Sequence, residues 1–169
     1  MALRPDEIYT LEKPVWTHED FASMGWHDVV IHAITFRPEV YEFVLDVDYI
    51  FAWVDPQPPS PYFSFWISPA TLVFQNVVNF KAQMEDPLGL QIMGISRKDP
   101  RPPRNADSIP LKTEWTWTID LLQGEIEFSS AGFCQYIRRS PIRVSAQHFS
   151  LEERGGISFE RAGTLQSSI

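Results

Sequence analysis

The chain has 169 residues, enough for one domain with a substantial core. Hydrophobic residues make up 44% of it and aromatic residues 14%, a composition that excludes intrinsic disorder. No stretch approaches the roughly 20 apolar residues of a membrane-spanning helix, the N-terminus lacks the features of a signal peptide, and Cys134 is the only cysteine. We therefore expect a single β-rich domain over residues 1–169 that works in the cytoplasm without a membrane partner.

The net charge of −8 comes from the first 60 residues, which hold 11 acidic and three basic side chains, whereas the rest of the chain holds 11 of each. This distribution disfavours nucleic acid and favours a cationic protein partner, although an acidic surface also serves solubility. Two small basic groups lie later in the chain, around Arg101 and around Arg138 and Arg143. We expect them to pair with the acids rather than to bind phosphate.

Near the N-terminus, Thr17 and Asp20 have the spacing of a capping box, with Asp in place of the usual Glu or Gln. They predict a short helix over 18–24, which Gly25 would end. The segment 27–37 predicts a strand, and a turn at 37–40 leads into the next one.

That next strand, 40–54, carries the clearest pattern in the chain. Its large apolar residues alternate along one side, and Glu42, Asp46 and Asp48 fall on the other. A period of two predicts a strand with one buried face and, here, an acidic outer face. The apolar side comprises Tyr41, Phe43, Leu45, Val47, Tyr49, Phe51 and Trp53.

Matching apolar side chains across the first hairpin predicts its register. The expected pairs are Phe36 with Tyr41, Ile34 with Phe43 and Val30 with Val47. In this register His32 lies beside Leu45 on the buried face.

The proline-rich segment 55–61 predicts a connection outside the sheet. It is followed by an aromatic strand over 62–68, which Pro69 is expected to interrupt, and by strand material over 71–85. A turn at 86–89 and a strand at 90–97 lead into 98–112, a proline-rich segment that we interpret as a long surface loop within the domain.

A second hairpin is predicted over 113–120 and 125–130. Its register sets Trp117 against Phe128 and Ile119 against Ile126 on the buried face, with Asp120 opposite Glu125 on the outer one. A strand over 133–139 follows, then weaker candidates at 142–150 and 156–160, and the tail 162–169 is expected to fray. Short strands joined by turns indicate a mainly β protein, an antiparallel sandwich or barrel-like sheet with one short N-terminal helix.

The group His27, Asp28 and His32 offers the best candidate chemistry, because two histidines and an aspartate can bind zinc or transfer protons. Alternation along a strand would point His27 away from the other two, so a structural role is the preferred interpretation. The sequence holds no motif for catalysis or for a cofactor, and we expect no cofactor.

Three runs resemble a little-studied group of bacterial proteins, similar in kind to the immunity proteins that accompany secreted toxins. They are Gly25-Trp26-His27-Asp28, the segment 65–74 (FWISPATLVF) and the segment 153–159 (ERGGISF). The resemblance implies a bacterial, cytoplasmic, β-rich domain with an immunity-like role, and it assigns no functional residue.

The leading hypothesis is therefore a non-enzymatic binding protein that captures a basic protein partner through Glu42, Asp46 and Asp48. One alternative is a metal-dependent or acid–base hydrolase centred on His27, Asp28 and His32. Another is a structural module that self-associates through an exposed sheet edge.

Overall fold

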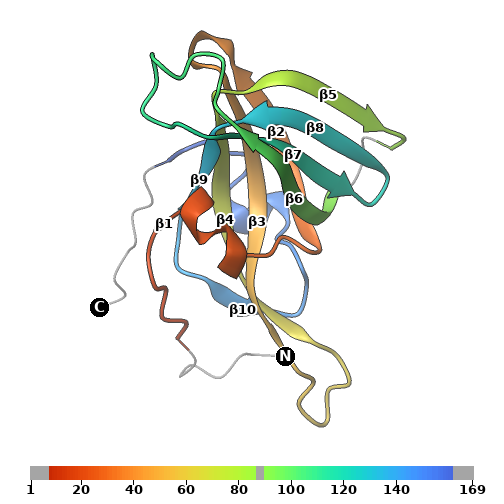
Figure 1. Ribbon diagram of the computed structural model, residues 1–169. Helices are drawn as coiled ribbons and strands as arrows, with labels where there is room; N and C mark the ends of the chain where they lie inside the picture. Colours follow the sequence, from red (N-terminus) through yellow and green to blue (C-terminus); the bar gives the residue numbers. More distant parts are fainter. Residues whose placement is uncertain (1–7, 87–89, 162–169) are drawn as a thin grey trace.

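The computed structural model describes residues 8–86 and 90–161 (Figure 1). They form one 10-stranded antiparallel sheet with the order β1-β9-β4-β3-β2-β6-β7-β8-β5, and β10 pairs with β4 beside this path. The sheet curls until its two halves face each other, yet its edges, β1 and β5, do not pair within the described part of the chain. The prediction of a mainly β protein with a barrel-like antiparallel sheet is confirmed, and the barrel is not closed.

The strands are β1 (Val15–Thr17), β2 (Val29–Arg37), β3 (Glu42–Val54), β4 (Ser64–Gln75), β5 (Val78–Met84), β6 (Gln91–Arg101), β7 (Glu114–Leu121), β8 (Gly124–Ser130), β9 (Gly132–Ile137) and β10 (Ile142–Val144). The helices are short: η1 (His18–Ser23), η2 (Pro38–Val40) and α1 (Leu151–Arg154).

Aromatic side chains from both halves of the sheet fill the inside of the curl. The ring of Phe74 on β4 lies 5.4 Å from Trp117 on β7 and 4.7 Å from Phe128 on β8. Three strands separate β4 from β7 in the sheet order, so the curl itself brings these rings together. All three side chains are almost completely buried, and the contacts join the two halves into one core.

The predicted N-terminal helix is present as the 3-10 helix η1, with the capping box between Thr17 and Asp20. The box matters because it supplies partners for backbone N–H groups that the first turn leaves unpaired. The helix places Phe21 against the core, with its ring 5.8 Å from Trp26 and 5.3 Å from Trp117.

The first hairpin differs from its predicted register by two residues. Phe36 pairs with Phe43 and Ile34 with Leu45, because the turn begins at Pro38 and ends with Tyr41 in the left-handed conformation. An even shift keeps every side chain on its predicted face.

A bulge between Ile31 and Ala33 then changes the faces of β2. Ile31 enters the core opposite Val47, and Val30 faces outward opposite Asp48. The prediction that His32 lies on the core face is wrong, since its imidazole contacts Asp48 on the opposite face.

Strand β4 runs through Pro69 without interruption, contrary to the prediction. Proline lacks an N–H, so it fits a sheet only where the neighbouring strand needs no donor. At Pro69 the neighbour changes from β9, which ends at Ile137, to β10, which starts at Ile142. The Pro69 carbonyl still accepts a hydrogen bond from the Arg138 N–H.

The second hairpin has the predicted register, with Trp117 opposite Phe128, Ile119 opposite Ile126, and Asp120 opposite Glu125. Strand β6 continues through Lys98–Arg101, and the long loop that follows covers 102–113. The strand predicted at 156–160 is absent, and α1, capped by Ser150, lies just before it. Residues 87–89 of the predicted turn 86–89 and the tail 162–169 lie outside the described residues.

The core contacts of Phe74 predict a large effect of its truncation. Phe74→Ala should lower the free energy of unfolding by about 3–5 kcal/mol, because the closely packed rings around it cannot collapse into the space. Urea denaturation followed by tryptophan fluorescence measures this loss. Leu122→Ala, at a side chain that is 58% exposed, serves as the control and should change stability by less than ~0.5 kcal/mol.

Candidate functional site

The carboxyl groups of Asp46 and Asp48, predicted to form an acidic outer surface, are fully buried. They do lie on the face of β3 opposite the core, as the alternation indicates. However, the segment 145–161, here called the C-terminal strap, folds back over that face. The prediction that both residues are exposed is therefore wrong, and it is wrong because of a contact with residues about 100 positions further along the chain.

Arg154 of the strap holds the two carboxylates. Its Nη2 donates to Asp46 Oδ1 at 2.6 Å, its Nη1 to Asp46 Oδ2 at 2.7 Å and its Nε to Asp48 Oδ1 at 3.1 Å. Arg138, which follows β9, donates to Asp46 Oδ1 at 2.7 Å. The expectation that Arg138 pairs with acids of the same chain is confirmed.

Two backbone N–H groups and an imidazole complete the cluster. The backbone N–H of Ser158 donates to Asp46 at 2.9 Å and that of Phe149 to Asp48 at 2.8 Å. His32 Nε2 lies 2.7 Å from Asp48 Oδ2. Burial alone raises the pKa of both carboxyls, but these hydrogen bonds and the nearby arginines outweigh it, so the pKa of each is below its usual value. Both aspartates are thus ionised at neutral pH. We call these five side chains, Asp46, Asp48, His32, Arg138 and Arg154, the ionic latch.

Glu42, the third predicted partner-binding residue, also pairs within the chain. Arg161, at the end of the described strap, donates to its Oε1 at 3.1 Å, and Arg37 Nη1 lies 3.7 Å from Oε2. The Glu42 side chain is 14% exposed. Arginines of this chain therefore engage all three acids, and the docking role predicted for them loses its basis.

The group His27, Asp28 and His32 does not converge. His27 Nδ1 lies 3.1 Å from Asp28 Oδ2, but the Asp28 carboxylate accepts hydrogen bonds from Gln91 and Gln147, and His32 turns to Asp48. Within residues 8–86 and 90–161, no group of three or more His, Cys, Asp or Glu side chains is placed to hold a metal ion. In this arrangement His27 and His32 thus contact different carboxylates.

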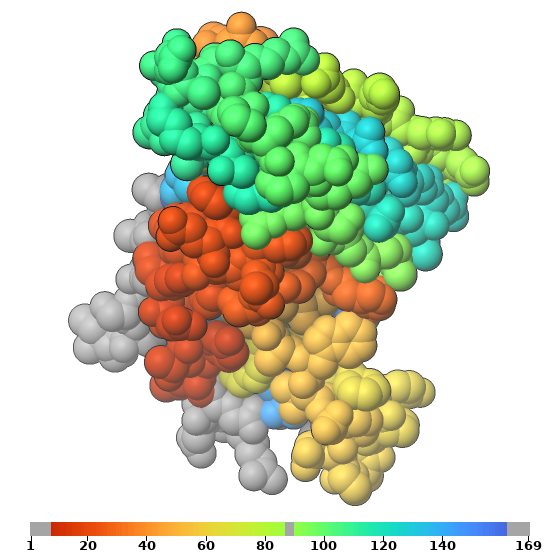
Figure 2. All heavy atoms as spheres, in the orientation of Figure 1, coloured from red at the N-terminus to blue at the C-terminus, as the bar shows by residue number. Residues whose placement is uncertain are grey.

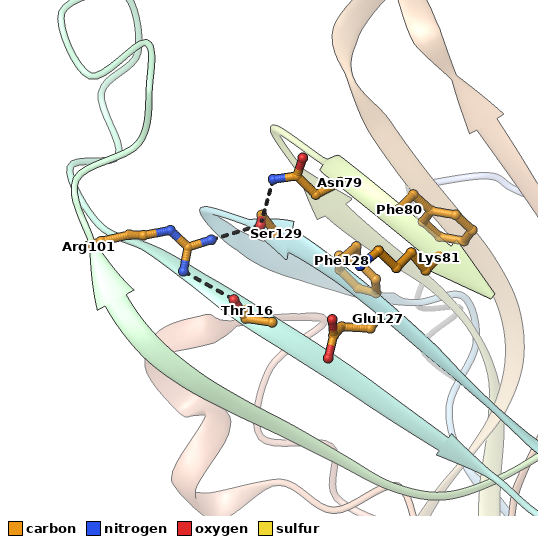
Figure 3. A pocket seen from close by; sticks show the side chains of 8 residues that line it. All are labelled: Asn79, Phe80, Lys81, Arg101, Thr116, Glu127, Phe128 and Ser129. Atoms are coloured by element: carbon orange, nitrogen blue, oxygen red, sulfur yellow. Dashed lines mark hydrogen bonds between the residues drawn. The ribbon is translucent and has the colours of Figure 1, made fainter. Parts of the chain in front are cut away.

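A cavity of about 380 Å³ lies over β5, β7 and β8 (Figure 3). Arg101 closes one side, where it donates to Thr116 Oγ1 at 3.1 Å and to Ser129 Oγ at 2.8 Å. Its Nε also pairs with Glu114 at 3.1 Å. The guanidinium and both hydroxyls are engaged with one another, and the other charged groups of the lining, Lys81 and Glu127, carry opposite charges.

Three exposed aromatic side chains form what we call the aromatic tip, Trp53, Tyr62 and Phe63. They are 46%, 76% and 43% exposed and sit where β3 and β4 meet the proline-rich connection 55–61. The ring of Trp53 lies 5.9 Å from Phe63 and 6.3 Å from His27. This end of the hairpin projects from the body of the molecule (Figure 2).

The sequence prediction missed the tip because alternation placed Trp53 on the buried face. Pairing between β2 and β3 ends at Val30 and Asp48, so the last residues of β3 pair with β4 alone. In addition, a bulge between Ile50 and Ala52 shifts the alternation, so Trp53 pairs with Phe65 on the opposite face from Tyr49. A proline-rich connection between two aromatic segments is the feature of the sequence that could have indicated an exposed hairpin end.

No protein-family model, curated protein or solved structure matches this chain. None of the helices in the described residues has the length and apolar character needed to cross a membrane. The site therefore has to be interpreted from its own geometry.

Removing one side of the ionic latch should be costly. Arg154→Met leaves Asp46 and Asp48 buried with too few partners, and we expect the free energy of unfolding to fall by about 3–5 kcal/mol. Chemical denaturation of the variant measures the loss. Arg37→Met is the matched control, because Arg37 is half-exposed and its ion pairs contribute little; equal effects of the two variants would contradict the latch.

The latch also predicts acid sensitivity. Because folding lowers the pKa of both aspartates below the ordinary 3.8, their stabilising effect is complete above that pH and is lost as the pH falls through the folded-state values. The free energy of unfolding, measured between about pH 6 and pH 2.5, should therefore drop steeply at the acid end. In Asp46→Asn with Asp48→Asn this slope should be shallower, and an unchanged slope would assign the acid sensitivity to other carboxyls.

Proposed function

We propose that this protein is a non-enzymatic binding protein that captures another protein through the aromatic tip. One observation carries the proposal: Trp53, Tyr62 and Phe63 are exposed together at the end of a projecting hairpin. Trp and Tyr supply much of the binding energy at protein interfaces, because they bury a large area at a small cost in conformational entropy. Exposed aromatic side chains that gather at one place are a typical mark of an interaction site.

The hairpin is suited to this role because its base is rigid. Residues 43–50 of β3 are buried on both sides, by the core and by the strap. At the tip, Trp53 packs edge-on against Phe65 with ring centroids 5.1 Å apart. A preorganised surface loses little entropy on binding, which favours affinity.

Self-association through the sheet edge is less well supported. The free edge of β5 carries a bulge between Val78 and Lys81, and Lys81 itself is exposed. Bulges and lysines are the features by which natural sheets discourage pairing between edges.

The resemblance to immunity-type proteins makes the proposal more specific: a bacterial protein of the cytoplasm whose partner is a toxin. A toxin gene beside the gene for this chain would support that version. The binding role itself does not depend on it.

Photocrosslinking tests the proposal. A photoreactive amino acid replaces Tyr62, the most exposed residue of the tip, and the protein is irradiated in cells of its natural source. We expect a discrete adduct with a second protein, identifiable by mass spectrometry, that disappears in Trp53→Ala. The same amino acid at Leu151, 51% exposed on α1, is the control and should not give this adduct. Identical adducts from both positions, or none from position 62, would contradict the proposal.

A further inference from the structure

We infer that the aromatic tip binds a basic segment of the partner, in which arginine or lysine side chains stack on its rings. This inference rests on the proposed function and gives the chemistry of the partner. In this view a cation is recognised at the aromatic tip and not at the buried acids of β3.

The charges around the tip favour a cation. The sequence contains no Lys or Arg between residues 38 and 80, a stretch that includes the whole β3–β4 hairpin. Asp55 follows β3 directly and is exposed at the tip. Arg143 of β10 pairs with Trp66 of the hairpin. Its side chain therefore lies on the sheet face that does not carry Trp53 and Phe65, where it donates to Ser64 at 2.8 Å.

His27 links the tip to a second carboxylate. Its ring lies 6.3 Å from Trp53, and its Nδ1 lies 3.1 Å from Asp28. The titratable groups near the rings thus include Asp55, Asp28 and the His27 imidazole. An approaching basic side chain meets aromatic faces together with negative charge, the combination that binds cations best.

The rings suit this chemistry. Trp has the strongest attraction for a cation among the aromatic side chains, followed by Tyr and Phe, and the tip has one of each. The same contact occurs inside the protein, where Arg97 lies 4.3 Å from the ring centre of Trp115 and Arg139 lies 4.6 Å from that of Phe149. An arginine from a partner would stack on the tip in the same way.

Labelled synthetic peptides of equal length, rich in arginine, in lysine or in glutamate, provide the probe, and fluorescence anisotropy measures their binding. We expect the arginine peptide to bind most tightly and the glutamate peptide not to bind. Tyr62→Ala should weaken binding of the arginine peptide by about two- to fivefold, and Trp53→Ala should weaken it by more, because each variant loses exposed cation–π contacts. If Trp53→Ala does not fold, Tyr62→Ala alone decides the result.

A charge reversal separates the electrostatic contribution. Asp55→Lys should slow association with the arginine peptide and flatten its dependence on salt, since exposed charges act mainly on the rate of encounter. The matched control is Glu152→Lys, at an exposed acid on α1. It should leave the association rate and its salt dependence unchanged.

The outcomes distinguish the two proposals. The inference of a basic segment is overturned if the glutamate peptide binds as tightly as the arginine peptide. It is also overturned if the tip variants bind the arginine peptide as tightly as the unmodified protein does. If Tyr62 still crosslinks a protein in that case, the proposed function stands with a partner of other chemistry. Tip-dependent arginine binding without a crosslinked protein would instead support the preference for cations and overturn the protein partner.

Discussion

The pairing of Asp46 and Asp48 with Arg154 is the interaction on which the rest of the structure depends. Removing an ion from water costs several kcal/mol, and β3 places two carboxylates side by side at the centre of the sheet. Two arginines, His32 and two backbone N–H groups compensate them. Since most of these donors belong to the C-terminal strap, the strap has to close over the sheet for the charges to be buried at all.

The latch also explains the difference between the middle and the end of the β3–β4 hairpin. In the middle, the core covers one face and the strap the other, so polar and apolar residues are buried alike. Beyond Asp48 the neighbour β2 has ended, and the bulge between Ile50 and Ala52 turns Trp53 to the other face, where it is half-exposed. The β3–β4 hairpin is fixed at its base and uncovered at its end. The surface available for binding therefore belongs to the most firmly anchored element of the fold.

Local patterns in the sequence predicted local structure well. The capping box of Thr17 and Asp20 is present, and the register of Trp117 with Phe128 is as predicted. Both depend on neighbours in sequence or on a short turn between two strands. The mainly β architecture follows from the same patterns, because alternating strands joined by turns can bury their apolar sides only in a sheet.

Predictions about the candidate site failed where they depended on distant segments. Alternation identifies the two faces of β3, but only the strap decides that the face of Asp46 is buried. The bulge beside His32 and the change of neighbour at Pro69 likewise depend on how other strands end. The face of Trp53 is set by the bulge between Ile50 and Ala52, which simple alternation does not predict. None of these facts is encoded within a few residues of the site.

The latch has a consequence for the order of events during synthesis of the chain. Asp46 and Asp48 leave the ribosome more than 100 residues before Arg154, because their hydrogen bonds span 106 and 108 positions. Until then, the centre of β3 is a hydrated, negatively charged strip that cannot be buried without large cost. The emerging strands can pair and collect their aromatic residues, but the charges of Asp46 and Asp48 are compensated only when Arg154 and the rest of the strap arrive. Burial of these two charges therefore depends on translation as far as the strap, and not on the sheet alone.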